Sequence, residues 1–309
     1  MKTNYPINPA YRGIKRFSFL SNGFMLALAN LLLKTAFIFT PPDAGVRQRK
    51  IKLKSYDGKY VCAYLFEPKN LDGKKTPLIV NCHGGGFILG VFSSQKSYSC
   101  FLAKKLNCRV ILPDYRLAQK YPFPTPVEDC YSTLCWCDDN AEKVNIRRDK
   151  IALYGDSAGG SLAAALSQMA RDRKGARLCF QMLIYPVCDC DMATASMKKF
   201  CDTPGWDSGL NRFMWETYLK NGDGGAIEYA APIKQKSFKD IPPTYIETAE
   251  FDCLRDEGRN YAELLKKNGV EVGYRHISDA PHGYDLVYKK EVLREVMEAR
   301  LAAYEKAFQ

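Results

Sequence analysis

The stretch that decides the fold is Ile151-Ala152-Leu153-Tyr154-Gly155-Asp156-Ser157-Ala158-Gly159-Gly160. Its four leading apolar residues predict a short buried strand, and the residues from Ala158 to Arg171 favour a helix. A serine flanked by glycines at such a junction is typical of a nucleophile elbow, in which a sharp turn raises the serine Oγ above the sheet. The stretch contains neither the Gly-Lys-Ser/Thr of a Walker loop nor the Gly-x-Gly-x-x-Gly of a Rossmann loop. We therefore expect Ser157 to be a nucleophile.

A second glycine-rich motif, His83-Gly84-Gly85-Gly86-Phe87, directly follows the apolar run from Leu78 to Cys82. Consecutive glycines leave backbone amides free to point at a bound anion. Attack of a serine on an ester carbonyl creates such an anion, and backbone N–H groups stabilise it by about 3 kcal/mol per donor. We expect this loop and the N–H of Ala158 to supply those donors.

A serine hydroxyl needs a base, and the chain has three histidines. His83 opens the glycine loop, where we expect it to brace that loop. His276 lies within the predicted strand from Val270 to Ile277 and shares a face with apolar residues, which favours a core histidine. His282 follows that strand in a loop, at the sheet edge where ligands bind, so we predict that it is the base.

The imidazole needs a carboxylate to fix its tautomer, and three acids follow the predicted strand from Thr244 to Thr248. Asp252 falls in the loop after that strand and is the predicted partner. Glu250 is an alternative candidate for the acid, although this residue would still belong to the strand. Asp256 suits the first turn of the next helix, near the positive end of its dipole.

The remaining pattern predicts an α/β fold. The runs Arg47–Lys54 and Tyr60–Phe66 flank the turn Tyr56-Asp57-Gly58, so the sheet opens antiparallel. Later apolar runs alternate with helical segments, which indicates a mostly parallel sheet with helices on both faces. Those runs are Leu78–Cys82, Arg109–Leu112, Ile151–Tyr154, Leu178–Tyr185, Thr244–Thr248 and Val270–Ile277; the helix candidates are Ser97–Leu106, Pro126–Asn140, Ala158–Arg171, Glu257–Asn268 and Leu286–Phe308.

Residues 189–231 break this alternation and are predicted to form a helical insertion beside the site. Together with residues 1–45 they would form a cap over a catalytic domain of residues 46–309. Aromatic residues around and within the insertion are candidates for the substrate pocket: Phe87, Trp206, Phe213 and Trp215.

The composition of the chain limits the classes of binding partner that we expect. The net charge is +11, yet the basic run Arg47–Lys54 alternates as a solvated strand face, and no zinc-finger, RNA-binding or basic-helix motif occurs. We therefore expect no nucleic-acid partner. Twelve cysteines, several within apolar runs, indicate reduced core residues of a cytoplasmic protein. Cys135-x-Cys137 and Cys188-x-Cys190 lack the usual zinc spacing, so we expect no metal site.

The N-terminal segment admits three interpretations. Basic residues precede a mostly apolar stretch, Phe17–Phe39, as in a signal peptide or a membrane anchor. Polar residues interrupt it at multiples of four and would trace a drifting stripe beside a broad apolar face; they are Ser18, Asn22, Asn30 and Lys34. Lys34 leaves an uncharged run at the lower limit for crossing a bilayer. We favour a helix packed over the site entrance.

The chain resembles the hormone-sensitive-lipase-like branch of the α/β-hydrolases over about residues 46–309. The resemblance rests on five motifs in the family's order: His83-Gly84-Gly85-Gly86-Phe87, Asp114-Tyr115-Arg116-Leu117-Ala118, Gly155-Asp156-Ser157-Ala158-Gly159-Gly160, Asp252-x-Leu254-Arg255-Asp256-Glu257-Gly258 and His282-Gly283. Two departures occur. Cys253 stands where the family usually has proline after the acid, and Gln119 stands where proline often follows Arg-Leu-Ala.

The resemblance implies a Ser157–Asp252–His282 triad, with the backbones of Gly85, Gly86 and Ala158 as oxyanion donors. It also implies that Asp114 and Arg116 buttress the glycine loop. The expected activity is that of a serine carboxylesterase acting on short- or medium-chain acyl esters, without a cofactor.

Two alternatives stay open: a non-catalytic small-molecule receptor on the same scaffold, and a lipase anchored to a membrane through residues 17–39. A homodimer is also among the expected assemblies.

Overall fold

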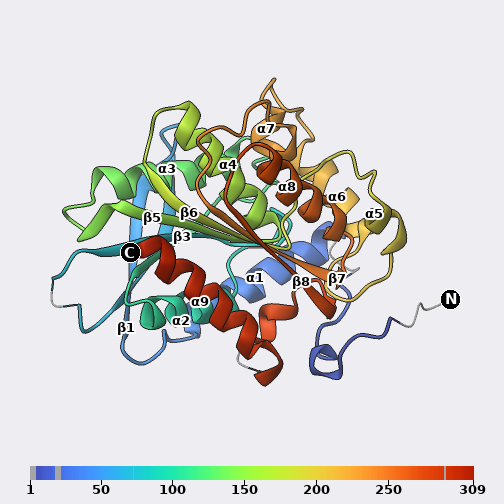
Figure 1. Cartoon of the computed structure of the whole chain (residues 1–309), viewed down its shortest axis with the longest axis horizontal. Helices are drawn as coiled ribbons and strands as arrows, with labels where there is room; N and C mark the ends of the chain where they lie inside the picture. The colour runs from blue at the N-terminus through green and yellow to red at the C-terminus, as the bar shows by residue number, and fades with distance from the viewer. Residues whose placement is uncertain (1–4, 18–21, 72, 289) are drawn as a thin grey trace.

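The computed structural model describes residues 5–17, 22–71, 73–288 and 290–309. Its described part contains one sheet of eight strands in the order β1-β2-β4-β3-β5-β6-β7-β8 (Figure 1). Strand β2 pairs antiparallel with β1 and β4, and every other neighbouring pair is parallel. The strands are β1 (Val46–Lys54), β2 (Tyr60–Pro68), β3 (Thr76–Cys82), β4 (Arg109–Asp114), β5 (Ile146–Asp156), β6 (Leu178–Ile184), β7 (Thr244–Phe251) and β8 (Val272–Pro281). The predicted α/β fold, a mostly parallel sheet that opens antiparallel, is confirmed.

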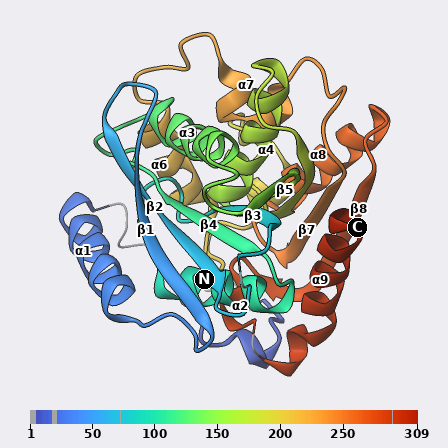
Figure 2. The same ribbon diagram turned by 90° about the vertical axis from the view of Figure 1, so that its left-hand side faces the viewer.

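Helices cover both faces of the sheet, as Figure 2 shows. One face carries α2 (Ser93–Lys105) and α9 (Arg294–Phe308), whose apolar side chains form one core cluster with the strands. The other face carries α3 (Thr125–Asp139), α4 (Ala158–Asp172) and α8 (Arg255–Lys267), which contribute to the second cluster. Helix α4 is rich in alanine and is buried almost throughout, so it can lie close against the sheet.

The sequence predicts a last helix from Leu286, but in the structure this helix begins later. Short 3₁₀ turns at Tyr284–Val287 and Glu291–Leu293 precede α9, which starts at Arg294. The reason is tertiary, since the Asp285 side chain is held by Tyr185 and Arg300 and ties this segment to the sheet.

The two segments predicted to form a cap contact each other. Between β6 and β7 lie three short helices, α5 (Ala195–Lys199), α6 (Ser208–Tyr218) and α7 (Ile227–Ala230). Arg16 Nε donates to Asp207 Oδ2 over 2.6 Å, and the Tyr5 hydroxyl donates to Asp202 Oδ1 over 2.7 Å. The N-terminal residues are therefore attached to the insertion.

Helix α1 (Gly23–Phe39) lies beside β1 at the edge of the molecule (Figure 2). Asn22 caps its N-terminus, because Asn22 Oδ1 accepts from the N–H groups of Phe24 and Met25. The expected polar stripe does not form. Asn30 points inward, where its amide donates to Ile88 O and accepts from Gly90 N; Ser18 lies outside the described residues. Within the described chain, no helix has both the length and the apolar character needed to cross a bilayer.

Candidate active site

Ser157 stands in the sharp turn between β5 and α4. Its backbone has φ 57° and ψ −123°, a conformation that L-residues rarely adopt. The flanking glycines are needed because strand and helix meet closely. A Cβ on Gly155 would lie 2.0 Å from Gly159 O, and one on Gly159 would lie 1.9 Å from Cys82 O. The motif thus folds into the predicted elbow.

The structure brings the three predicted side chains together across 125 residues of sequence. His282 Nε2 lies 3.0 Å from Ser157 Oγ, and His282 Nδ1 lies 2.7 Å from Asp252 Oδ2. Asp252 directly follows β7, is fully buried, and its Oδ1 accepts from Leu254 N over 2.9 Å. His282 directly follows β8 and is 7% exposed. An unbroken hydrogen-bonded chain therefore joins carboxylate, imidazole and hydroxyl.

The other two histidines lie elsewhere. His83 is fully buried; its Nδ1 lies 2.8 Å from Gly84 O, and its ring stacks on Tyr115 at 4.1 Å. Burial lowers the pKa of His83 to about 4, so it stays neutral and braces the loop. His276 was expected in the core and is instead exposed on β8, one of the two edge strands, with its Nδ1 3.3 Å from Thr248 Oγ1.

The predicted anion site has free donors in suitable positions. Gly85 and Gly86 have φ of +110° and +62°, and no other group in the described chain accepts from their N–H groups. Ala158 is the first residue of α4, so its N–H has no acceptor within the helix. A Cβ on Gly86 would lie 2.5 Å from Trp206 Cη2, so a side chain there would disturb the loop.

A cavity of about 470 Å³ opens in front of Ser157 and His282 and is mainly apolar. Trp206 lines it, as predicted, together with Leu89 and Leu286. Helix α1 contributes Ala29, Leu32 and Leu33, so this helix forms part of the cavity wall.

Three of the predicted pocket residues are absent from the described lining of this cavity. Phe87 is fully buried and stacks on Tyr218 with ring centroids 3.9 Å apart. Trp215 packs 6.4 Å from Phe87, and Phe213 is half-buried on the same helix, α6. The prediction fails for Phe87, Phe213 and Trp215 because their apolar surface is used to attach α6 to the domain.

The glycine loop is braced by Tyr115 and not by Arg116, one of the two residues expected to buttress it. Arg116 pairs with Asp129 and Asp57, away from the loop. The bracing residue is Tyr115, which stacks on His83 and donates its hydroxyl to His83 O over 2.9 Å. Gln119 also helps, since its amide donates to Ile88 O over 2.6 Å, a contact that proline could not make.

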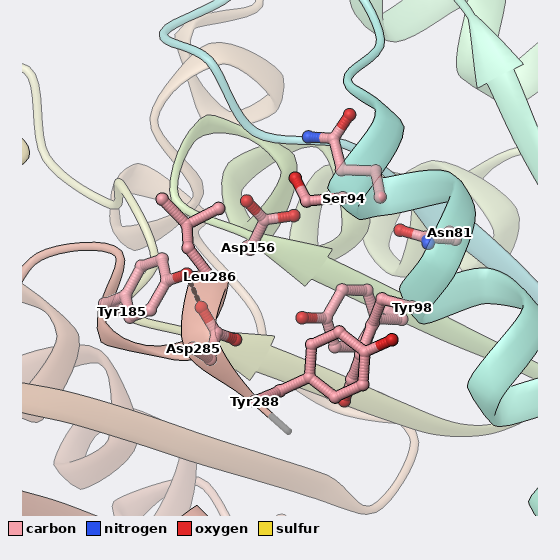
Figure 3. Close-up of a pocket in the computed structure, with 10 residues that line it drawn as sticks. Asn81, Ser94, Tyr98, Asp156, Tyr185, Asp285, Leu286 and Tyr288 are labelled. Carbon is pink, nitrogen blue, oxygen red and sulfur yellow. Dashed lines mark hydrogen bonds between the residues drawn. The ribbon is translucent and has the colours of Figure 1, made fainter. Parts of the chain in front are cut away.

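A buried charged network behind the site was not predicted. Arg300 Nη1 donates to Asp285 Oδ2 over 2.8 Å, and Nη2 donates to Glu247 Oε2 over 2.6 Å. The Tyr185 hydroxyl donates to the other oxygen of Asp285 (Figure 3) and its ring lies 4.6 Å from that of His282. This network holds the segment after His282 against the sheet. The residues of this network form no sequence motif, so only their burial as charged groups identifies the network.

Asp156 faces the same region, and Figure 3 shows it beside Ser94 and Asp285. Its Oδ1 accepts from Gly84 N over 3.2 Å. Burial, reinforced by the charge of Asp285, raises the pKa of Asp156 to about 7.

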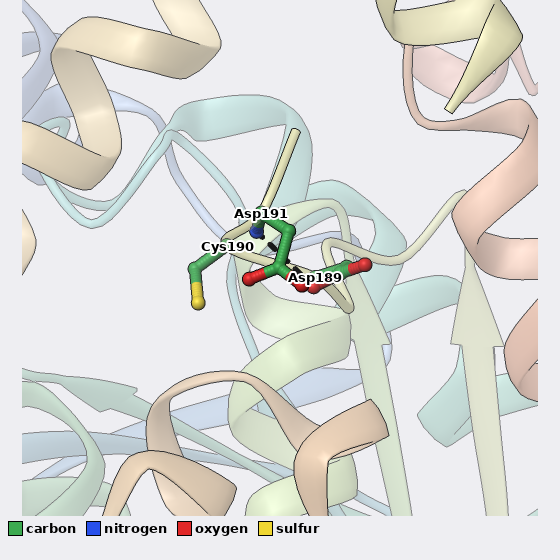
Figure 4. A group of neighbouring side chains, drawn as sticks. All are labelled: Asp189, Cys190 and Asp191. Carbon is green, nitrogen blue, oxygen red and sulfur yellow. Dashed lines mark hydrogen bonds between the residues drawn. The ribbon is translucent and has the colours of Figure 1, made fainter. Parts of the chain in front are cut away.

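A cluster with the donor atoms of a metal site occurs in the insertion, where Asp189, Cys190 and Asp191 lie together (Figure 4). Lys234 Nζ approaches Asp189 Oδ1 at 3.4 Å and also pairs with Asp191. The lysine already balances these carboxylates, so the cluster is explained as a surface ion pair.

Comparison with known proteins agrees with this geometry. A family model described as alpha/beta hydrolase fold matches residues 79–286. An arylesterase of Saccharolobus solfataricus is 34% identical over 246 residues, which cover 79% of this chain and 78% of the relative. The carboxylesterase NlhH of Mycobacterium tuberculosis is 34% identical over 67% of this chain and 66% of its own. A bacterial heroin esterase superposes with TM-score 0.90 at 31% identity, over 99% of this chain and 100% of that one.

Proposed function

Because the chain belongs to the alpha/beta hydrolase fold family, we propose that it is a serine carboxylesterase that hydrolyses short- or medium-chain acyl esters. The hydrogen-bonded chain from Asp252 through His282 to Ser157 carries this proposal, because it is the arrangement that activates a serine hydroxyl. The esterases among the similar proteins support the same chemistry.

The reaction proceeds in two halves. Ser157 Oγ attacks the ester carbonyl while His282 Nε2 takes its proton, and Asp252 stabilises the imidazolium. The N–H groups of Gly85, Gly86 and Ala158 bind the oxyanion. The imidazolium then protonates the departing alcohol, which leaves Ser157 acylated. Water, deprotonated by His282, releases the acid and restores the serine; the steps need no cofactor.

The pocket supports small apolar esters. A cavity of about 470 Å³ with a mainly apolar lining suits a ligand of modest size. The N-terminal residues 1–45 and the insertion 189–231 would act together as a cap, which agrees with the Arg16–Asp207 ion pair. All twelve cysteines are free thiols, which favours a cytoplasmic location.

The test is hydrolysis of p-nitrophenyl esters from acetate to palmitate by the protein and by Ser157→Ala. We expect the substitution to lower kcat by about 10⁴-fold or more, because the nucleophile is lost. The wild-type rate should be highest for short and medium chains. Ser161→Ala is the matched control, since that buried serine donates to Ala230 O, outside the triad.

Wild-type turnover by Ser157→Ala would overturn the serine mechanism. Preference for palmitate would overturn the proposed chain length.

A further inference from the structure

Helix α1 presents an apolar surface to solvent. Seven of the eleven exposed large apolar residues in the described chain lie on it: Phe24, Met25, Leu28, Leu31, Leu32, Ile38 and Phe39. Phe24 and Phe39, at its two ends, are 76% and 80% exposed. Most of these residues recur at helical spacing, so they form one continuous stripe. Stripes of this kind are uncommon on soluble proteins and mark interaction sites.

The stripe faces outward because polar contacts fix the opposite side of the helix. Asn30 binds the backbone at Ile88 and Gly90. At the C-terminal end of the helix, the buried Lys96 of α2 donates to Phe37 O and to Thr40 O, the latter over 2.6 Å. Because the inner face is anchored at its middle and at its C-terminal end, the helix cannot rotate its stripe inward without breaking these bonds.

The N-terminal part of the sequence, which contains α1 and β1, is rich in positive charge. The first 54 residues contain ten lysines and arginines and a single acid, Asp43, so they carry +9 of the chain's net +11. Helix α1 itself has one charged residue, Lys34, which is exposed. Such a concentration of one sign favours a partner of the opposite sign.

Strand β1 extends this charge on the same face of the sheet. Lys50 pairs across strands with Tyr64, and the Tyr64 ring lies 4.6 Å from that of Phe37 on α1. Because strand residues alternate, Lys52 and Lys54 share this face with Lys50. In the described chain none of these three lysines, nor Lys34, forms a salt bridge with an acid.

The half-buried Asp114 lies close to Lys34 and Lys50. Burial raises the pKa of Asp114, and the charges of Lys34 and Lys50 oppose that shift. Asp114 and Asp43 together leave the four lysines with a positive net charge.

We propose that α1 and β1 form a docking face for anionic lipid surfaces, with α1 lying in the plane of the membrane interface. The apolar stripe enters the boundary between headgroups and acyl chains, and Lys34, Lys50, Lys52 and Lys54 contact anionic headgroups. A second copy of the chain fits less well, because a two-fold interface would bring the two sets of lysines together.

Docking would place the membrane next to the cavity. Leu32 belongs both to the stripe and to the cavity lining, and Leu286 is exposed at the same entrance. Resting on the proposed esterase function, this continuity points to esters dissolved in or bound to a lipid surface as the substrate class.

The experiment is co-sedimentation of the full chain with phosphatidylcholine vesicles, with and without phosphatidylglycerol. We expect binding to the anionic vesicles that weakens as salt is added. Leu31→Glu/Ile38→Glu should lower the affinity by at least about tenfold, since two apolar side chains no longer leave water. Lys50→Glu/Lys52→Glu should remove the preference for phosphatidylglycerol.

Two matched controls should retain wild-type binding: Val292→Glu, an exposed apolar residue outside the stripe, and Lys266→Glu/Lys267→Glu on α8. Hydrolysis of soluble p-nitrophenyl acetate should be unchanged in all these variants, so a failure of docking is distinguishable from a failure of the esterase proposal. Absence of binding to anionic vesicles would overturn the docking face. So would a dimer, seen by sedimentation equilibrium, that Leu31→Glu/Ile38→Glu dissociates.

Discussion

The active-site edge of the sheet, where Ser157, Asp252 and His282 follow their strands, is here called the rim. The rim and helix α1 are held in place by different contacts. At the rim, Ser157, Asp252 and His282 each directly follow a strand, so the backbone itself places them. In the described structure the outer side of helix α1 is exposed, and its inner side is attached through Asn30 and Lys96 together with the buried Leu26 and Phe37. Strand ends therefore fix a side chain locally, whereas a peripheral helix is oriented by partners that are distant in the sequence.

The largest effect should come from Asp252→Asn at the rim. The amide cannot stabilise the imidazolium and favours the wrong tautomer, so kcat should fall by about 10⁴-fold. Asp256→Asn is the control, because its carboxylate accepts from Ser196 N and pairs with Arg255 instead. Equal losses in steady-state kinetics of the two variants would contradict the assignment of the acid.

Two buried cations allow the two regions to be compared directly. Arg300→Met would leave the Glu247 and Asp285 carboxylates buried without their cation, at a cost of about 3 to 5 kcal/mol in unfolding free energy. Lys96→Met would leave only two carbonyls of α1 unpaired, at about 1 to 2 kcal/mol.

Thermal and urea unfolding would measure both changes. Arg294→Met is the control on α9, since its exposed pair with Glu291 should contribute less than about 1 kcal/mol. A smaller loss for Arg300→Met than for Lys96→Met would contradict the view that the rim depends on its buried network.

One glycine substitution in each of the two regions should have different effects on kcat. Gly86→Ala would force a Cβ to within 2.5 Å of Trp206 and strain a φ of +62°, so we expect kcat to fall by about 10 to 100-fold as the oxyanion donors move. Gly23→Ala, at the start of α1 with nothing within 4 Å, should leave kcat unchanged. Partial recovery in Gly86→Ala/Trp206→Leu would identify the steric cause; unchanged kcat in Gly86→Ala would argue against the donor role.

The active-site edge of the sheet should also show a pH dependence of stability. The pKa of Asp156 is about 7 in the folded protein and about 3.8 when exposed. Between these values the folded state retains a proton that the unfolded state has lost, so this group's contribution to stability decreases as pH rises through 7. Asp156→Asn cannot ionise, so its melting temperature should improve relative to wild type between pH 4 and pH 8. A difference that does not change with pH would show that Asp156 titrates normally.

Much of the fold and the triad could be predicted because the signals are local. The turn at Ser157 needs glycines where strand and helix meet, and His282 and Asp252 directly follow strands that apolar runs reveal. The resemblance to the hormone-sensitive-lipase-like branch is confirmed at the level of family. The features that the sequence patterns did not predict depend on contacts between residues that are distant in the sequence. Asn30 lies on the inward side of α1, where it bonds the backbone of Ile88 and Gly90, which are 58 and 60 residues away in the sequence.

The errors have the same origin. Phe87 belongs to the glycine-rich motif and Trp215 to the insertion, but hydrophobicity alone does not say whether a ring lines a cavity or fills a core. His276 shares its face of β8 with apolar residues, yet this is an edge strand. Arg300 carries no motif, and its importance follows from burial beside two carboxylates.

Labelling with a fluorophosphonate, followed by peptide mass mapping, tests most directly whether His282 activates Ser157. We expect a single phosphonylated residue, Ser157, with the labelling rate strongly reduced in His282→Ala because the hydroxyl loses its base. Labelling at another residue, or an equal rate in His282→Ala, would contradict this expectation.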